Sequence, residues 1–149
     1  MKKYFYLGLI ALLACGNSFA QEDRKIEQAI KHRKAAFTLM ATYWSRLLQT
    51  VEGTRPYDPN AVIADAKKVE YLSYLPWEGF VAGSERGDTK AKDDIWLDEE
   101  QFKKMAKDLE AKTSNLVKVA ELKDSKKLKI AFEQARDTCN ACHKQFRKK

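Results

Sequence analysis

The stretch IEQAIKHRKAAFTLMATYWSRLLQTV, residues 26–51, decides the fold of this 149-residue chain. Its core positions recur at alternating spacings of four and three residues, and all but one of them are apolar. This heptad pattern predicts a long helix that packs at a shallow angle against neighbouring helices. Gly53 and Pro56 are expected to end it. The positions of this seam are Ile26, Ile30, Arg33, Phe37, Met40, Trp44, Leu47 and Val51.

Three more amphipathic segments follow. The second helix is expected to begin after Asp58, its cap, and to end before Pro76. The third is capped by Asp98 and the fourth begins near Asp124, and no strand pattern occurs anywhere. The sequence therefore predicts an all-α, antiparallel four-helix bundle that spans residues 21–149 as one domain. The apolar stripe of the fourth helix carries Leu128, Phe132, Ala135, Cys139, Cys142, His143 and Phe146.

A long connection, residues 76–98, separates the second and third helices. Three glycines punctuate it, and it contains Trp77, Phe80 and Trp96. Loops of this length in a compact domain usually have a function. Three large aromatic side chains indicate that this loop covers something apolar.

The first 20 residues have the pattern of a secretory signal peptide. Lys2 and Lys3 precede an apolar stretch, residues 4–14, which is too short to span a bilayer, and Ser18-Phe19-Ala20 offers small residues before a cleavage site. The mature chain would begin at Gln21 and lie in the periplasm, without stable membrane insertion. The alternative is a lipoprotein that is acylated and anchored at Cys15.

The charge balance excludes few functions. Without Lys2 and Lys3, the 28 basic residues fall to 26 against 21 acidic ones. No basic stripe with stacking aromatics is present, so nucleic acid is not an expected partner. No group of residues resembles a catalytic acid–base pair or an activated nucleophile, and the chain is therefore not expected to be an enzyme.

The C-terminal stretch CNACH, residues 139–143, concentrates the thiols and imidazoles of the mature chain, where only His32 lies elsewhere. A structural zinc site needs four ligands, usually in two separated pairs. A thioredoxin-like redox pair would follow a strand in a βαβ unit. A disulfide between residues three apart in a helix has poor geometry. These alternatives are disfavoured against covalent haem attachment, for which Cys-x-x-Cys-His is the signature.

The haem interpretation has a physical reason. Cysteines at i and i+3 lie on one helix face and can form thioethers with two vinyl groups along one haem edge. The next residue, His143, can then reach the iron. The predicted export to an oxidising compartment also fits, because c-type haem is attached there. The expected cofactor is one haem c, held by Cys139 and Cys142 and ligated by His143.

Two features bear on the surroundings of such a haem. Arg33 lies in an apolar seam, where it would either extend to water or meet a propionate. A second strong ligand would make the iron six-coordinate, as in electron carriers. The candidates are His32, Met40 and Met105, and Phe37, one turn before Met40, cannot coordinate. The residues alone leave this choice open.

Several motifs resemble the cytochrome c′ family, the high-spin class II c-type cytochromes. They occur in the family's order and spacing over essentially the whole mature chain: IKHRKAAFTLM, TRPYDP, LSYLPWEGF, GSERGDTKAKDDIW, LDEEQF and CNACHKQFR. The resemblance implies a periplasmic four-helix bundle, commonly a homodimer. It also implies a five-coordinate iron with an apolar distal pocket that binds nitric oxide and carbon monoxide but not dioxygen.

The resemblance also assigns residues. Arg33 would contact a propionate, with Lys34 and Asp88 near the haem edge. Phe37 would occupy the distal position, and Arg147 would lie beside the proximal histidine, where it also suits the helix dipole.

The expected function is thus nitric oxide binding, for sequestration, transport or protection. The alternative is periplasmic electron transfer through a haem edge near Lys144–Lys149. A bundle without haem is disfavoured by the Cys-x-x-Cys-His motif.

Overall fold

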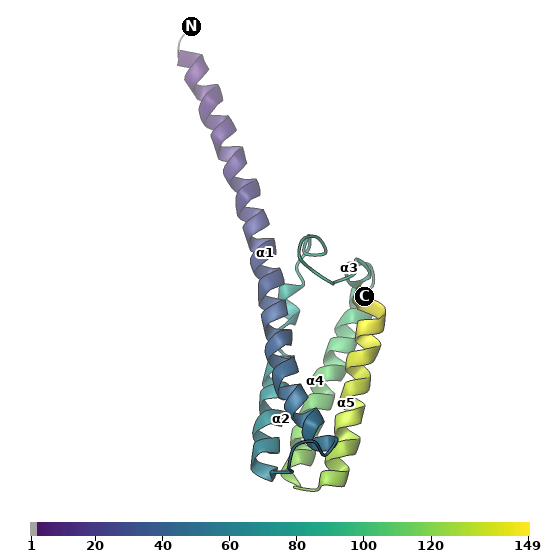
Figure 1. The fold of residues 1–149 in the computed structure, drawn as a ribbon. Helices are drawn as coiled ribbons and strands as arrows, with labels where there is room; N and C mark the ends of the chain where they lie inside the picture. The colour runs from purple at the N-terminus through teal and green to yellow at the C-terminus, as the bar shows by residue number, and fades with distance from the viewer. Residues whose placement is uncertain (1–2) are drawn as a thin grey trace.

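In the computed structural model, residues 3–149 are described, with side chains from Gln21 onward. Four helices form an antiparallel bundle: α1 (Lys3–Val51), α2 (Pro59–Ser73), α4 (Glu99–Glu121) and α5 (Ser125–Phe146). The connection between α2 and α4 contains a 3₁₀ turn, η1 (Trp77–Gly79), and a short helix, α3 (Asp94–Leu97). Figure 1 shows the bundle, with α1 extending well beyond its open end. The predicted fold class is confirmed.

The heptad seam of α1 is confirmed at every position. All eight side chains, from Ile26 to Val51, are buried or half-buried. The helix ends at Val51, and Gly53 follows with a φ of 78°, a left-handed conformation that favours glycine. At its other end α1 begins at Lys3, earlier than expected, so the helix continues through the predicted signal segment. The side chains of that segment, including Cys15, lie outside the described residues, and cleavage before Gln21 stays a prediction.

The two predicted helix caps, Asp58 and Asp98, are confirmed, and Asp124, near which the fourth helix was expected to begin, is a cap as well. The Asp58 carboxylate accepts hydrogen bonds from the backbone N–H groups of residues 60 and 61, at 2.9 and 3.3 Å. Asp124 accepts from residues 126 and 127, at 3.0 and 3.1 Å, and Asp98 accepts from Gln101. Each aspartate satisfies backbone donors that a helix start leaves without partners.

The apolar core fills the end of the bundle where the tight α1–α2 and α4–α5 connections lie. Trp44 of α1 stacks on Phe132 of α5, with ring centroids 4.2 Å apart. Leu47, Leu116 and Leu128 around them are almost completely buried. The packed core therefore holds the helices together at this end of the bundle, and the opposite end is not part of it.

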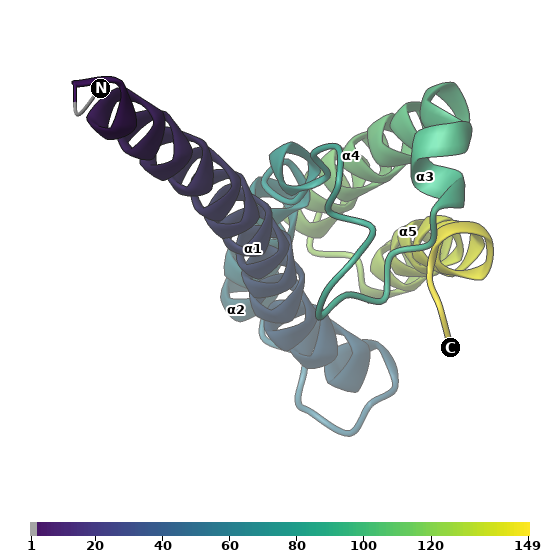
Figure 2. The same ribbon diagram turned by 90° about the horizontal axis from the view of Figure 1, so that it is seen from above.

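The connection between α2 and α4 crosses the open end of the bundle. Figure 2 shows it running from the α1–α2 side across to α5, where the C-terminus lies. There Ala91 forms an isolated antiparallel bridge with Arg147. The sequence predicted this segment as a loop, and the prediction is correct except for the short η1 and α3. Among the described residues, no helix combines the length and the apolarity that crossing a membrane requires.

Candidate functional site

The open end of the bundle encloses a cavity of about 680 Å³. This volume lies within the range of about 300–1,000 Å³ that is typical of small-molecule and cofactor pockets. The three chemically active residues of the C-terminal motif, Cys139, Cys142 and His143, all lie at this cavity. The predicted apolar stripe of α5 thus brings all three residues to one cavity, where the two cysteines are half-buried and His143 is exposed. The aromatic and aliphatic side chains of the wall are Phe37, Met40, Trp44, Val69, Trp77, Phe80, Ile95, Phe102, Leu109 and Phe146.

The two cysteines are free thiols, each half-buried. Burial raises the pKa of both thiols. For Cys142 the pKa is raised to about 11, mainly by burial and in addition by the neighbouring Cys139. At neutral pH both are therefore protonated thiols and weak nucleophiles. Helix α5 presents them three residues apart at one cavity, as the haem interpretation requires.

The imidazole of His143 lies at the same cavity, in the last turn of α5. Partial burial lowers its pKa, and the nearby charge of Arg147 lowers it further. Both effects favour the neutral imidazole at pH 7, which is the form that binds metals. Arg147, which the family pattern places beside this histidine, thus contributes through its charge and through the backbone bridge to Ala91.

The alternatives for the cysteine–histidine cluster fit the structure poorly. No group of three or more His, Cys, Asp or Glu side chains is placed to hold a metal ion among residues 21–149, which disfavours zinc. The cysteines are not paired, and the chain from residue 3 onward contains no βαβ unit. A structural disulfide and a thioredoxin-like site are therefore both disfavoured.

Arg33 is buried, with 2% of its surface exposed, although it carries a full charge. Its guanidinium donates hydrogen bonds to the carbonyl of Gly79 (2.8 Å), to Ser84 Oγ (2.7 Å) and carbonyl oxygen, and to Thr89 Oγ1 (2.8 Å). It also lies 4.5 Å from the centroid of the Phe80 ring. The alternative in which Arg33 extends to water is therefore wrong. Burial lowers its pKa, as expected for a cation removed from solvent.

The close approach of η1 to α1 explains why Arg33 can reach the loop. A Cβ on Gly79 would lie 2.6 Å from the carbonyl oxygen of Ala29 and 2.8 Å from the Cβ of Arg33. Only a glycine permits this contact between the two backbones. The loop thus packs against α1 at Arg33, which is one of the residues that line the cavity.

Lys34 and Asp88 lie together at the cavity mouth and pair with each other, as Lys34 donates to the Asp88 carboxylate. The hydrogen bond from Lys34 and then its charge lower the pKa of Asp88, which is fully exposed. Both residues thus line the cavity and bind one another, and their position near a haem edge stays a prediction.

Phe37 lies at the cavity in an aromatic group with Trp77 and Phe80. Its ring meets that of Trp77 edge-on at 5.9 Å and that of Phe80 at 6.4 Å. Met40 also lines the cavity, whereas Met105 and His32 do not. His32 Nε2 bonds instead to the carbonyl of Leu75, at 2.8 Å, and to the Glu78 carboxylate. Met40 is thus the one cavity residue among the three candidate sixth ligands.

Two buried donors, the indole N–H groups of Trp77 and Trp96, have no hydrogen-bond partner among residues 21–149. A buried donor without an acceptor is costly. Trp77 lies at the cavity wall close to Phe37 and Phe80. A bound group with acceptor atoms would satisfy it, and the two thiols, the neutral imidazole and the cationic Arg33 fit a haem with its carboxylates. The residues present therefore fit the group.

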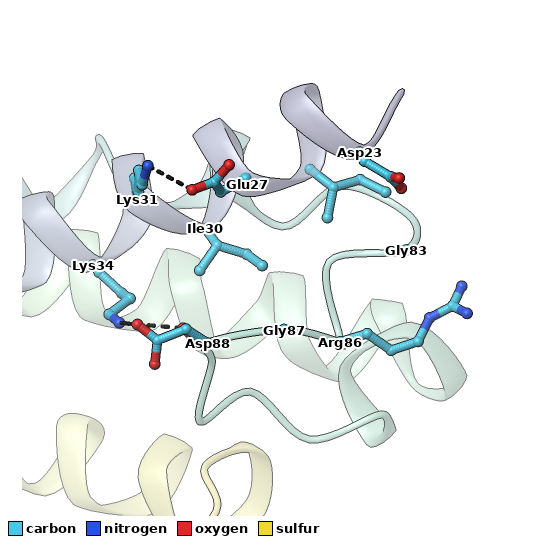
Figure 3. A pocket seen from close by; sticks show the side chains of 10 residues that line it. Asp23, Glu27, Ile30, Lys31, Lys34, Gly83, Arg86, Gly87 and Asp88 are labelled. Carbon is cyan, nitrogen blue, oxygen red and sulfur yellow. Dashed lines mark hydrogen bonds and ion pairs between the residues drawn. The ribbon is translucent and has the colours of Figure 1, made fainter. Parts of the chain in front are cut away.

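A second hollow, of about 420 Å³, lies between α1 and residues 83–88 of the loop. Figure 3 shows two ion pairs among its charged side chains, Lys31 with Glu27 and Lys34 with Asp88, while Asp23 and Arg86 pair with no other lining residue. It offers no buried polar group that lacks a partner, and we assign it no ligand.

Sequence reasoning missed the residues that hold the loop in place. Ser84 is completely buried and binds Arg33, and Thr89 accepts from Arg33 and from the backbone N–H of Ala91. Lys92 reaches the end of α5. Small polar residues in a loop next to a buried arginine are a usable signal for the first two. Nothing in the sequence indicates the contact of Lys92.

The fold and the cavity together define a class of protein: a helical bundle with a Cys-x-x-Cys-His helix that carries haem. The sequence matches the family model for cytochrome c′ over residues 28–147. A cytochrome c′ from Alcaligenes xylosoxydans xylosoxydans is 38% identical over 125 residues, which cover 84% of this chain and 97% of that one.

Solved structures agree. Cytochrome c′ from Shewanella frigidimarina has a TM-score of 0.81 and 32% identity, covering 83% of this chain and 97% of the other. A nitric oxide complex of a variant of Alcaligenes xylosoxidans cytochrome c′ has a TM-score of 0.78 and 36% identity, with 83% and 96% covered. This chain belongs to the cytochrome c′ family, whose members carry one covalent haem c.

Proposed function

We propose that this protein binds nitric oxide and carbon monoxide at a five-coordinate haem c, and that it sequesters or carries nitric oxide in the periplasm. One observation carries the proposal: Cys139, Cys142 and His143 line the same apolar cavity as Phe37 of α1. The nitric oxide complexes solved for a relative support the same ligand.

Each residue of the motif has one task. Cys139 and Cys142 would tether the haem through thioethers, and His143 would be its proximal ligand. The haem supplies an iron atom that binds diatomic gases. Arg33 would contact a propionate at the wall below the loop, and Lys34 and Asp88 would border the haem edge at the mouth. This assignment agrees with the lowered pKa of His143, which partial burial and then the charge of Arg147 cause.

The sixth position is left to a gas because the described side chains offer no suitable competitor. Phe37 cannot coordinate, and His32 is committed to Leu75 and Glu78. Met40 belongs to the buried apolar core, where methionine most often fills space. We therefore favour a high-spin iron over a six-coordinate electron carrier.

Selectivity for nitric oxide and carbon monoxide over dioxygen would require that no hydrogen-bond donor of the wall reaches the bound gas. Bound dioxygen is stabilised by a hydrogen-bond donor in the distal pocket. Arg33 and Thr113 at the wall already bond to protein partners. Among residues 21–149, the indole N–H of Trp77 is the one buried side-chain donor of the wall that lacks a partner, whereas Lys90, Arg136, Asn140 and Arg147 line the cavity with exposed side chains. The Trp77→Phe variant therefore tests the exclusion of dioxygen directly.

The experiment is an absorption spectrum of the reduced holoprotein before and after nitric oxide, carbon monoxide or air is admitted, with the protein mass determined on the same sample. A mass raised by one haem and a broad Soret band that shifts with both gases support the proposal. A sharp low-spin spectrum that ignores nitric oxide would refute it. A stable dioxygen complex that disappears in Trp77→Phe would refute the selectivity alone.

Electron transfer is the second candidate. Lys144, Lys148 and Lys149 are exposed at the end of α5 beside the cavity, and they offer a docking face for an acidic redox partner. The low-spin spectrum described above would favour this function.

Export and assembly complete the proposal. Residues 1–20 would be removed as a signal peptide and residues 21–149 retained as a single domain, and the family match over residues 28–147 supports this division. We also propose a homodimer, and exposed Leu39 on α1 and Tyr71 on α2 are available for its interface. The protein would act by binding, without catalysis.

A further inference from the structure

The end of α5 poses a problem of hydrogen bonding. The last four carbonyl groups of a helix have no partner within it. In α5 these belong to residues 143–146, so the problem falls on the turn that begins with His143. The carbonyl of His143 itself accepts from the backbone N–H of Arg147, at 3.1 Å. Three carbonyls remain.

A single residue of the crossing loop, Lys92, satisfies all three. Its ammonium Nζ donates to the carbonyl of Gln145, at 2.9 Å, and to that of Lys144, at 3.4 Å. Its backbone N–H donates to the carbonyl of Phe146, at 3.0 Å. The Lys92 side chain is half-buried, and no carboxylate among residues 21–149 lies within ion-pair distance of it. A cation at the negative end of the helix dipole is favourable in addition.

The backbone around Lys92 continues the attachment. Ala91 bridges Arg147, and the backbone N–H of Lys148 donates to the carbonyl of Lys90, at 2.7 Å. Residues 90–92 and 146–148 thus form a short two-stranded clasp, seen in Figure 2 where the loop reaches the C-terminus. On the other side, Thr89 joins the clasp to Arg33 of α1.

We propose that Lys92 is a positioning residue for His143: by capping the last turn of α5 it fixes the imidazole on the cavity wall. The inference rests on the proposed function, since the position of His143 matters only if it binds iron. Without the ammonium, two carbonyls of this turn lose their protein partner and the turn opens more often. The imidazole of His143 would then hold the iron of a bound haem less firmly.

The test compares holoprotein variants. Lys92→Met keeps the length of the side chain and removes its donors, and Lys92→Arg restores donors that can reach two carbonyls. Lys148→Met is the matched control, because it removes an equal charge from the same clasp while its exposed side chain makes no hydrogen bond or ion pair among residues 21–149. Lys92→Gln, which retains an uncharged NH2 donor group, is made in case Lys92→Met does not accumulate.

Two readouts are measured on each protein. Amide hydrogen exchange over residues 143–148 should be roughly tenfold faster in Lys92→Met, because a charge-assisted hydrogen bond is lost. The iron–imidazole stretching band of the ferrous protein, measured by resonance Raman, should shift to lower frequency. Lys92→Arg should restore both, Lys92→Gln should lie between, and Lys148→Met should match the unaltered chain.

The outcomes separate the two proposals. If the unaltered chain carries haem and binds nitric oxide, but Lys92→Met and Lys92→Gln leave the band and the exchange unchanged, the inference about Lys92 is wrong and the proposed function stands. Equal effects of Lys92→Met and Lys148→Met would also overturn it, since charge alone would then explain them. If the unaltered chain carries no haem, the proposed function fails and this inference fails with it.

Discussion

Arg33 shows how one side chain joins two parts of the molecule. It occupies an apolar seam position of α1, and its hydrogen bonds go to three residues of the crossing loop, Gly79, Ser84 and Thr89. These acceptors are neutral, and the nearby Glu85 carboxylate attracts the charge without forming an ion pair with Arg33. A buried cation of this kind still favours an anion nearby, which supports its proposed contact with a propionate.

Phe37 should control access to the iron. Its ring occupies the cavity beside Trp77 and Phe80, so Phe37→Ala would open space at the wall. We expect carbon monoxide and nitric oxide to bind several-fold faster, as measured by stopped-flow or flash photolysis. Thr42→Ala, on the exposed face of the same helix, should leave the rates unchanged. Equal rates in all three proteins would show that Phe37 does not limit entry.

The two cysteines should react slowly in the folded chain without haem. Burial raises the pKa of Cys142 from 9.0 to about 11, and it raises that of Cys139 in the same direction. At pH 8 the thiolate fraction of Cys142 is then about a hundredfold lower than in an unfolded chain. Alkylation by iodoacetamide, followed by mass spectrometry, should be slow in buffer and fast in guanidinium chloride. Equal rates would contradict these pKa shifts.

The raised thiol pKa values also set a pH dependence. A group that binds its proton more tightly in the folded state stabilises that state at low pH. The contribution of Cys142 to the free energy of unfolding of the haem-free chain is therefore fully present below pH 9, and it is lost as the pH rises through about 11. Denaturant midpoints measured across this range should fall, and Cys142→Ser should remove most of the fall.

At the scale of the element, the helices were predictable because their signals are local. Heptad spacing marks α1, and Asp58, Asp98 and Asp124 mark the starts of α2, α4 and α5. The short α3 and η1 were not predictable, since each is a single turn held by contacts with distant segments. Ile95 of α3, for example, packs in a cluster with Phe102 and Phe146.

Gly79 should be intolerant of a side chain. In Gly79→Ala the new Cβ would meet the backbone of α1 at 2.6 Å, and the loop would have to lift away from Arg33. We expect a loss of about 1–3 kcal/mol in the free energy of unfolding, measured with urea, as for other overpacked sites. The holoprotein spectrum should change as well.

Gly53→Ala provides the contrast. Nothing lies within 4 Å of a Cβ at Gly53, so the change is limited to the strain of a positive φ in the α1–α2 connection. It should lower stability modestly and leave the spectrum unaltered. A similar spectral change in both variants would refute the claim that the loop contact is specific.

At the scale of the whole molecule, the two ends of the bundle have different tasks. One end contains the tight core of Trp44, Phe132 and their neighbours, and the other contains the cavity. The motif at residues 139–143 and the seam of α1 predicted the residues on both walls. The hydrogen bonds of Ser84, Thr89 and Lys92 were not predictable, because they join residues 50 or more positions apart through an irregular loop.

The proposed homodimer has a direct test. Sedimentation equilibrium of the holoprotein at micromolar concentration should give twice the mass of one chain. Leu39 and Tyr71 are exposed by 52% and 69%, so a charged pair, Leu39→Glu with Tyr71→Glu, should shift the mass to that of one chain. The gas-binding spectrum should not change, because neither residue lines the cavity. A monomer in the unaltered protein would end this proposal.

The enclosed, protonated thiols have a consequence for the order of biogenesis. Once the four helices have packed, Cys139 and Cys142 are half-buried on α5, and their raised pKa values make them weak nucleophiles. Haem attachment is therefore expected before α5 packs into the bundle, while both thiols are still fully accessible. Folding would then enclose the attached haem, and a chain that folded before attachment would lack the cofactor.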